Sequence, residues 1–269
     1  MISKLFRKLV DLSPKLSLIG WKYFYELTAQ LFKKMASWKF MNYGYANEET
    51  TTIDYDILCG NLYRHLFDQT NINNETSILE VGCGRGGGSE LLLEYNPKSV
   101  TGIDFSKNVI KFCQQNYHDA RLKFVVGNAE HLPFSNNSFD VIINVESSHC
   151  YGNRGTFFKE VARTLKPSGY FLYADFMSRI HYPKRPAQLQ ECGLKLLSEQ
   201  EITPQVLKSM QLSQTYKEAL LKKIVIKPFR KSIADFAGLP GSNIYNKFAN
   251  GDTVYFSIMC SKEKLNNEV

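Results

Sequence analysis

Glycine dominates one short stretch of the sequence, where residues 80–88 read Glu-Val-Gly-Cys-Gly-Arg-Gly-Gly-Gly. The stretch follows an apolar run at residues 77–81 and precedes a segment at residues 89–95 with the composition of a helix. Glycine lets a ligand approach the backbone closely, and the start of a helix offers N–H groups without partners. We therefore predict that this loop binds a ligand, because so many glycines would destabilise a loop that binds nothing.

The glycine spacing fits two kinds of cofactor site. Gly82 and Gly84 open a G-x-G-x-x-G pattern, which is typical of dinucleotide-binding folds. The same stretch satisfies E-x-G-x-G-x-G, with Glu80 two residues before the first glycine. Asp104 ends a second apolar run, where a carboxylate suits the hydroxyls of a ribose in either kind of site. Asp104 could instead cap a helix that begins at Ser106.

His149 is the residue that we predict to be catalytic. It follows an apolar run at residues 139–145, and parallel sheets keep their ligands at the carboxyl ends of the strands. Imidazole has an unperturbed pKa of about 6.5, so it can take a proton from a hydroxyl near neutral pH. The alternative role is structural, with His149 forming a hydrogen bond that holds the loop at residues 146–152.

Apolar runs alternate with helical segments from residue 77 onward. Strands are predicted at residues 77–81, 99–105, 122–126, 139–145 and 170–176. Helices are predicted between them at residues 89–95, 107–117 and 156–165. A strand at 193–197, a mostly helical segment at 203–223 and a last strand at 253–260 follow. This order predicts an α/β fold with a seven-stranded, mainly parallel sheet and helices on both faces.

Four stretches, in order, carry a resemblance to a known family. They read ILEVGCGRGGG at 78–88, VTGIDFS at 100–106, GNAEHLPFSNNSFDVI at 127–142 and LKPSGYFLYADF at 165–176. Together they resemble the class I S-adenosylmethionine-dependent methyltransferases over about residues 38–184. The stretch at 144–151, Asn-Val-Glu-Ser-Ser-His-Cys-Tyr, looks most like the branch that O-methylates phthiotriolone-type lipids. An oxidoreductase that uses NAD would explain the glycines but not the third and fourth stretches.

The resemblance implies a Rossmann-like methyltransferase fold and S-adenosylmethionine as the cofactor. It also implies a set of cofactor-binding residues. Glu80, Gly82 and Gly84 would border the methionine and ribose, Asp104 would accept from the ribose hydroxyls, and Phe105 would flank the adenine. Asn128, Ala129 and Glu130 would cover the adenine edge, and Asn144 and Val145 would line the sulfonium side. Tyr45 would contribute from residues 38–45, which resemble the segment that closes over the cofactor in many small-molecule methyltransferases.

The N-terminal region is unusually basic. Residues 1–40 hold eight basic and two acidic side chains, so they carry +6 of the chain's net charge of +7. Residues 2–12 and about 17–39 have the apolar periodicity of amphipathic helices. Such basic helices can lie on an anionic membrane surface, or their apolar faces can pack on the rest of the protein.

We predict two parts in the chain. Residues 1–45 form a basic amphipathic helical extension and lid, and residues 46–269 form the methyltransferase domain. Residues 180–250 are too long for a simple connection between two strands. We therefore predict that they form part of the wall of an acceptor pocket.

Composition excludes several classes of protein. The chain has 43% hydrophobic residues, 17 Gly and 9 Pro, which is ordinary for a globular protein. Its 6 Cys are scattered without a CxxC pair, and its 5 His are far apart, so neither a disulfide scaffold nor a metal centre is predicted. No uncharged apolar stretch of about 18 residues occurs. No secretory signal or nucleic-acid-binding module is recognised, and we predict a cytoplasmic protein able to rest peripherally on a membrane.

The predicted function is transfer of a methyl group from S-adenosylmethionine to a hydroxyl of a lipidic or polyketide-like small molecule. A nitrogen or carbon acceptor on another small molecule is the nearest alternative. A non-catalytic protein that binds S-adenosylmethionine is the other alternative, and retained cofactor binding without methyl transfer would reveal it.

Overall fold

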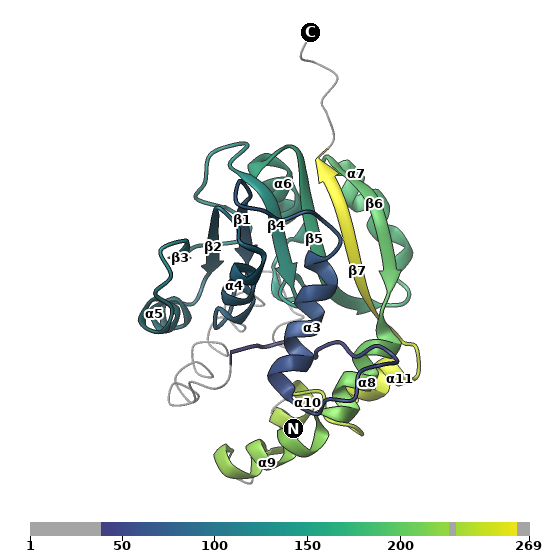
Figure 1. The fold of residues 1–269 in the computed structure, drawn as a ribbon. Helices are drawn as coiled ribbons and strands as arrows, with labels where there is room; N and C mark the ends of the chain where they lie inside the picture. The colour runs from purple at the N-terminus through teal and green to yellow at the C-terminus, as the bar shows by residue number, and fades with distance from the viewer. Residues whose placement is uncertain (1–38, 226–229, 263–269) are drawn as a thin grey trace.

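The computed structural model describes residues 39–225 and 230–262 (Figure 1). The predicted helices at residues 2–12 and about 17–39 lie outside these residues, except for Lys39, which is not helical. No helix in the described ranges has both the length and the apolar character needed to cross a membrane.

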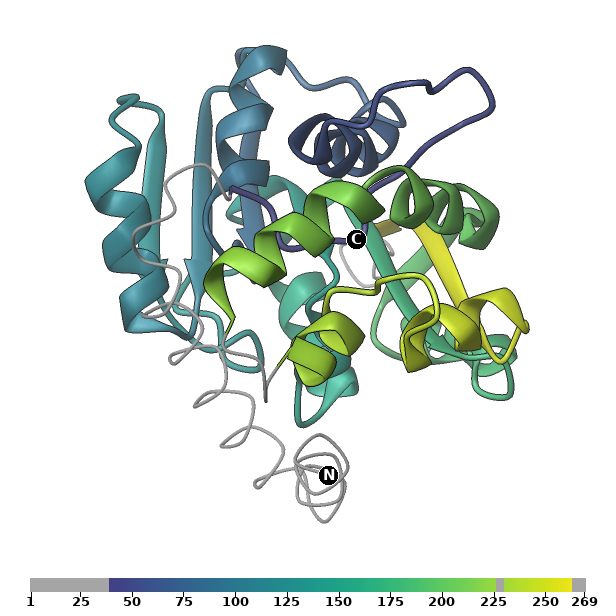
Figure 2. The ribbon, with the colours of Figure 1, turned by 90° about the horizontal axis from the view of Figure 1, so that it is seen from below.

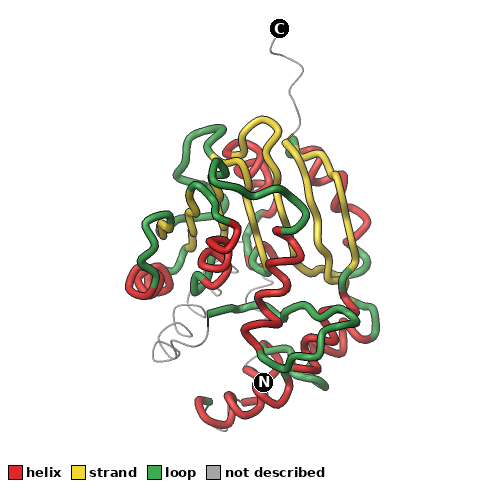
Figure 3. The backbone as a smooth tube through the Cα atoms, in the orientation of Figure 1, coloured by secondary structure: helices red, strands yellow, loops and turns green. Residues whose placement is uncertain are grey.

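Seven strands form one sheet in the order β3-β2-β1-β4-β5-β7-β6 (Figure 1), and Figure 3 shows these strands in yellow. Their bounds are Ser77–Val81 (β1), Ser99–Asp104 (β2), Leu122–Val126 (β3), Phe139–Val145 (β4), Leu165–Ser178 (β5), Leu194–Glu201 (β6) and Thr253–Lys262 (β7). Strands β1 to β5 pair in parallel, and β7 runs antiparallel to both of its neighbours, β5 and β6. The predicted seven-stranded, mainly parallel sheet is confirmed.

Nine α-helices occur in the described ranges. Their bounds are Tyr55–Phe67 (α3), Gly87–Leu91 (α4), Lys107–Asn116 (α5), Arg154–Thr164 (α6), Arg185–Glu191 (α7), Thr203–Leu212 (α8), Gln214–Ile224 (α9), Arg230–Phe236 (α10) and Asn243–Ala249 (α11). Three 3-10 helices lie at Leu92–Tyr95 (η1), Ser148–Cys150 (η2) and Tyr182–Lys184 (η3).

Alternate residues of each strand contribute to cores on opposite faces of the sheet. In β1, Ile78 packs in a cluster that includes residues of α3 and α4, whereas Leu79 packs in a second cluster with residues of α6. This alternation follows from the period of two in a strand. Helices therefore cover both faces of the sheet, as predicted.

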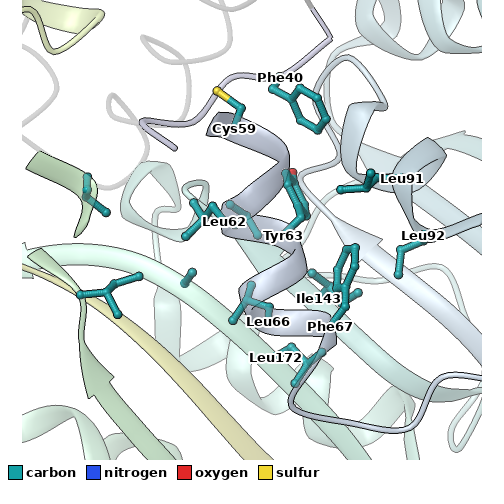
Figure 4. Packing of buried hydrophobic residues seen from close by; sticks show 14 of the residues in the cluster. Phe40, Cys59, Leu62, Tyr63, Leu66, Phe67, Leu91, Leu92, Ile143 and Leu172 are labelled. Carbon is teal, nitrogen blue, oxygen red and sulfur yellow. The ribbon is translucent and has the colours of Figure 1, made fainter. Parts of the chain in front are cut away.

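Helix α3 is absent from the elements predicted from the sequence. Its N-cap Asp54 accepts hydrogen bonds from the backbone N–H groups of Asp56 and Ile57, and the basic residues Arg64 and His65 stand in its last turn. Both features stabilise a helix. Its apolar side chains pack against the sheet and α4 (Figure 4). Helix α3 matters for function because it carries Tyr63, which lines the candidate site.

Tertiary pairing extends β5, β6 and β7 beyond their predicted bounds, by the most in β5 and β6. Strand β5 begins at Leu165 rather than Tyr170, since Leu165 pairs with Phe139 across an irregularity in the register. Strand β6 continues to Glu201 because the edge of β7 pairs with its polar residues as well. Backbone hydrogen bonds do not depend on side-chain polarity, so alternation in the sequence does not mark these ends.

The helices α8 to α11 gather beyond the carboxyl ends of the parallel strands (Figures 1 and 2). This is the end at which residues following β1, β2 and β4 come together. Residues 180–250 thus supply helices next to that end of the sheet.

Candidate active site

A cavity of about 320 Å³, called here the first cavity, lies at the carboxyl ends of β1, β2 and β4. Seven of the predicted cofactor-binding residues line it: Gly82, Gly84, Asp104, Phe105, Asn128, Ala129 and Val145. Its size is in the lower part of the range for small-molecule sites. The fold therefore brings together residues that are up to 63 positions apart in the chain.

The glycine loop needs glycine for its shape. Gly82 has a φ of 73°, and a Cβ there would lie 2.3 Å from the Ser147 hydroxyl oxygen. Gly86, with a φ of 82°, is the N-cap of α4, and a Cβ there would lie 2.6 Å from the Tyr117 ring. These left-handed conformations are available to glycine at little cost. The loop can thus fold tightly over β1 while its backbone borders the first cavity.

Asp104 joins the glycine loop to the end of β2. Its Oδ2 accepts a hydrogen bond of 3.1 Å from the Gly84 N–H, and its Oδ1 accepts one of 2.9 Å from the Ser106 N–H. The N-cap of α5 is Ser106, whose hydroxyl accepts from the Val109 N–H. Asp104 is thus not the N-cap, and its carboxylate faces the first cavity between the loop and the start of α5.

Four predicted residues do not line the first cavity: Tyr45, Glu80, Glu130 and Asn144. Tyr45 stacks on His65, with 4.6 Å between the ring centroids. Glu130 accepts a 2.8 Å hydrogen bond from the Gly152 N–H, and Asn144 donates one of 3.0 Å to the Tyr151 hydroxyl. Glu130 and Asn144 hold the loop after β4 in place. They would therefore affect cofactor binding indirectly, by positioning residues of this loop.

Glu80 lies beneath the glycine loop, where it is 1% exposed. The Tyr63 hydroxyl donates to its Oε1 over 2.8 Å, and the Ser89 hydroxyl donates to its Oε2. Burial raises the pKa of Glu80 to about 7, although both hydroxyls favour the carboxylate. Glu80 thereby links β1, α3 and α4 around the first cavity.

Residues Lys39 to Asn42 cover one side of the first cavity. The Lys39 ammonium forms an ion pair of 2.7 Å with Glu90 on α4, and Phe40 is buried against Tyr63. A Cβ at Gly87 would lie 2.7 Å from the Lys39 carbonyl oxygen, so this segment passes very close to the glycine loop. The segment that we predicted as a lid is in contact with the loop.

His149 lines a neighbouring cavity of about 1280 Å³, called here the second cavity. Its Nδ1 lies 2.8 Å from Asp175 Oδ1, and its backbone N–H donates to Asp175 Oδ2 over 3.1 Å. The imidazole also packs on Phe176, with 4.4 Å between the ring centroids. Tyr151 lines both cavities, so the short loop after β4 separates them.

Burial and nearby charges have opposite effects on the pKa of His149. Burial favours the neutral imidazole, but Cys150 and Asp175 outweigh it and raise the pKa of His149 well above its usual value. Burial likewise opposes ionisation of Asp175, yet the nearby His149 lowers the pKa of its carboxyl. The pair therefore favours an imidazolium beside a carboxylate.

Asp175 was not predicted from the sequence, and Glu146 was considered only as an alternative base to His149. Asp175 follows the apolar run of β5 in the stretch Tyr-Ala-Asp-Phe, and a carboxylate buried at a strand end was the available signal. Glu146 has a φ of 43°, which costs about 1 kcal/mol outside glycine. Only the tertiary structure shows what holds it there.

Glu146 connects three segments at the edge of the first cavity. Its Oε1 accepts hydrogen bonds of 2.7 Å from the Tyr43 N–H and 2.6 Å from the Tyr255 hydroxyl. Burial raises the pKa of Glu146 to about 7, against the effect of these two donors. Glu146 lines the first cavity and Tyr43 lines the second, so this contact lies at the boundary between them.

The first cavity offers a defined set of ligand contacts. Phe105 and Ala129 provide apolar surface for a flat ring, Asp104 provides a carboxylate for hydroxyl groups, and the glycine loop provides exposed backbone. This combination suits a nucleoside with a polar extension. Across residues 39–225 and 230–262, no group of three or more His, Cys, Asp or Glu has the arrangement of a metal site.

Comparison with known proteins identifies relatives over most of the chain. The family model described as "Methyltransferase domain" matches residues 79–173. A probable phthiotriol/phenolphthiotriol dimycocerosates methyltransferase 2 of Mycobacterium ulcerans (strain Agy99) is 34% identical over 231 residues, which cover 82% of this chain and 88% of that protein. A fatty-acid O-methyltransferase of Mycolicibacterium smegmatis is 33% identical over 226 residues, which cover 80% of each chain.

Solved structures share the fold at low sequence identity. The [4+2]-cyclase SpnF superposes with a TM-score of 0.77 and 19% identity, covering 91% of this chain and 95% of that one. Geranyl diphosphate C-methyltransferase from Streptomyces coelicolor A3(2), solved with S-adenosyl-L-homocysteine, gives a TM-score of 0.70 and 16% identity, covering 91% and 97%. The two titles name different reactions, so the fold by itself does not define the chemistry.

The matched relatives and the first cavity agree on the cofactor, which is S-adenosylmethionine. The identity of 34% over most of both chains also shows the family of the protein. It belongs to the class I S-adenosylmethionine-dependent methyltransferases, in the branch that includes the phthiotriol and phenolphthiotriol dimycocerosates methyltransferases.

Proposed function

We propose that this methyltransferase acts on an oxygen atom of a lipidic small molecule, with His149 as the general base. The observation that carries the proposal is the contact of 2.8 Å between Asp175 and the Nδ1 atom of His149, which lines the second cavity. An acceptor hydroxyl is a weak nucleophile, so removal of its proton lowers the barrier to attack. Nitrogen and carbon acceptors are the alternatives that the experiment below separates.

S-adenosylmethionine, when bound, supplies a methyl group on a positively charged sulfur. We propose that Asp104 binds its ribose hydroxyls and that Phe105 and Ala129 contact its adenine. Gly82 and Gly84 would present backbone to its amino-acid part. These residues all line the first cavity. Their role is to orient the methyl group toward the second cavity.

Asp175 is proposed as a positioning residue for the base. It binds both the side chain and the backbone of His149 and is itself 1% exposed. With Nδ1 held by the carboxylate, Nε2 is the nitrogen that would accept the acceptor proton. The imidazolium formed in that step is stabilised by Asp175, and the proton remains on His149 until it is released to solvent.

Apolar walls of the second cavity support a lipidic acceptor. Phe158, Phe176, Met177, Phe236 and Ile244 all line it. Apolar surface of this kind favours a hydrocarbon chain over water. The names of two relatives, a dimycocerosates methyltransferase and a fatty-acid O-methyltransferase, refer to lipids as well.

The test is transfer of labelled methyl from S-adenosylmethionine to a lipid extract, with His149→Ala compared with His181→Ala. Both histidines line the second cavity, but His181 is exposed, whereas His149 is hydrogen-bonded to Asp175. We expect His149→Ala to lower kcat by about 10²- to 10⁴-fold without changing cofactor affinity. His181→Ala should remain active.

The product identifies the acceptor atom. A methyl ether supports the proposal, and a methyl ester supports the oxygen acceptor alone, because a carboxylate has no proton for His149 to remove. An N-methyl or C-methyl product contradicts the oxygen acceptor. Full activity of His149→Ala would reject His149 as the base. Tight binding of S-adenosylmethionine without any transfer would favour the non-catalytic alternative.

We also propose that residues 2–12 bring the protein to anionic membranes, where a lipidic acceptor is concentrated. Their sequence combines Ile2, Leu5 and Leu9 with Lys4 and Arg7 at helical spacing. Each basic side chain near an anionic surface contributes about 1 kcal/mol, and salt screens this part. Deletion of residues 1–12 should abolish co-sedimentation with anionic vesicles. Equal co-sedimentation of the full-length and shortened proteins would reject this role.

A further inference from the structure

Basic side chains without carboxylate partners gather in the second cavity. Arg154, Lys159, Lys184 and Lys247 all line it. None of the four forms an ion pair with a carboxylate in the described part of the chain. Charges that face one cavity without a partner are available to a ligand of opposite charge.

Most of the other arginines in the described residues form ion pairs with carboxylates. Five of them form ion pairs with carboxylates within 4.0 Å: Arg64, Arg121, Arg163, Arg179 and Arg185. Arg163 lies on the same helix as Arg154 and pairs with Glu160 at 2.7 Å. Arg154 thus lines the second cavity without an ion pair, whereas Arg163 on the same helix is paired with a carboxylate.

Acidic side chains of the cavity do not neutralise this charge. Glu191 and Asp235 are its carboxylates, and Asp235 already accepts a hydrogen bond of 2.6 Å from the Asn243 N–H. The carboxylate of Asp175 is bonded to His149. With four basic and two acidic side chains, the lining has a positive excess before either histidine is protonated.

Arg154 stands at a favourable point for binding an anion. It is the first residue of the 11-residue helix α6, where backbone N–H groups add positive potential. It is partly buried, and the apolar Phe158 lies one helical turn further along the same cavity wall. Arg154 also contributes to lowering the pKa of Asp175, so its charge reaches the His149 pair. A ligand that combines an anionic group with a hydrocarbon chain would satisfy both surfaces.

We propose that Arg154, assisted by Lys159 and Lys184, forms a subsite for a carboxylate or phosphate group on the acceptor. Arg154 is then a specificity-determining residue that selects anionic amphiphiles over neutral lipids of equal length. This inference rests on the proposed function, in which the second cavity binds the acceptor. A guanidinium suits both oxyanions because it can donate two parallel hydrogen bonds.

Calorimetry on the full-length protein tests this subsite. Octanoate, octyl phosphate and 1-octanol are titrated into protein saturated with S-adenosylhomocysteine, and again without it. We expect at least one anion to bind about tenfold more tightly than 1-octanol. Arg154→Gln should remove most of that difference, and Arg154→Lys should retain part of it. Arg163→Gln, the same change on the same helix, should leave the difference intact.

The three probes separate the sources of the anion. A preference for octanoate indicates a fatty-acid type of acceptor, and a preference for octyl phosphate indicates a phosphorylated one. Equal binding of all three probes overturns the subsite, as does an Arg154→Gln protein that keeps the wild-type preference. Failure to bind S-adenosylhomocysteine counts against the proposed function instead, because the subsite does not depend on that ligand.

Discussion

Backbone from neighbouring strand ends forms much of the first cavity, whereas side chains from widely separated segments form the second. The glycine loop, Asp104 and Asn128 of the first cavity lie at the ends of three consecutive strands of the chain. The second cavity combines Tyr43, His149, Phe176 and Phe236, which belong to four distant segments. Cofactor recognition thus depends on the sheet, and acceptor recognition depends on what has been added around it.

This difference explains how one fold can accommodate many acceptors. Changes to the glycine loop alter a backbone shape that the sheet requires, as the 2.3 Å approach at Gly82 illustrates. Changes to the side chains that α6, α10 and α11 contribute to the second cavity leave the sheet intact. Substitutions in the two cavities should therefore have separable effects on cofactor binding and on turnover.

Asp175→Asn should give the largest difference between the effect on turnover and the effect on cofactor binding. The change keeps the shape of the side chain but removes the charge that stabilises the imidazolium of His149. We expect kcat to fall by about 10²- to 10⁴-fold while the affinity for S-adenosylmethionine stays near that of the wild type. Steady-state kinetics and calorimetry measure the two effects.

A second readout distinguishes positioning from general damage to the fold. Without the carboxylate, the pKa of His149 should decrease, so residual activity should persist to lower pH than in the wild type. Asp140→Asn, which removes a surface partner of Lys166, is the matched control. An unchanged pH profile in Asp175→Asn would argue that Asp175 only supports the loop.

Asp104→Ala should have the opposite effect and weaken cofactor binding rather than acceptor binding. Loss of charge-assisted hydrogen bonds to the ribose should weaken S-adenosylmethionine binding by about 1 to 3 kcal/mol, with little effect on an acceptor bound in the second cavity. Calorimetry with the cofactor measures this loss. Asp119→Ala, at an exposed pair with Arg121, serves as the control. Normal cofactor affinity in Asp104→Ala would remove Asp104 from the site.

The pH dependence of turnover reports on the second cavity alone. The pKa of His149 lies well above 6.5 in the folded protein, so the neutral base form increases as pH rises through that higher value. Below it, kcat should fall by about tenfold per pH unit, while cofactor affinity changes little. A pH–rate profile with an inflection at or below 6.5 would contradict the effect of Asp175 on the base.

Lys217→Met should show a smaller effect, on stability. Lys217 is 5% exposed, and its ammonium has no hydrogen-bond partner among the described residues, although it lies over the rings of Tyr55 and Tyr43. Burial lowers its pKa, so its charged form destabilises the fold. Replacing it should raise the free energy of unfolding by about 1 kcal/mol, or the Tm by about 2 to 4 °C.

The sign of the pH effect checks the cause. Because the folded-state pKa of Lys217 is below 10.5, wild-type stability should increase as pH rises from that folded-state value toward 10.5. Lys217→Met should lose this increase, and Lys208→Met, an exposed lysine on α8, should keep it. Lower stability of Lys217→Met at neutral pH would show that the ammonium has a favourable role beside Tyr43.

The sequence predicted best those parts of the site that lie within short segments of the chain. The strand and loop at residues 77–88 and the acid at Asp104 predicted the first cavity, because a parallel sheet brings consecutive strand ends to one edge. Helix α3 was not predicted, although Asp54 caps it. Tyr63 lies on this helix and was missed for the same reason. His149 was identified as a base candidate, but its partner Asp175 lies 26 residues away on the next strand.

The sequence by itself determined the order of the strands, the glycine loop and, through its resemblance to a known family, the chemical class of the cofactor. The strands and the loop depend on periodicity and spacing within short segments, which the backbone converts directly into local structure. The tertiary structure alone decided that Asp175 meets His149, that Glu146 joins Tyr43 to Tyr255, and that Arg154 faces the second cavity. Such contacts depend on how separate elements pack, and no spacing along the chain encodes the distance between them.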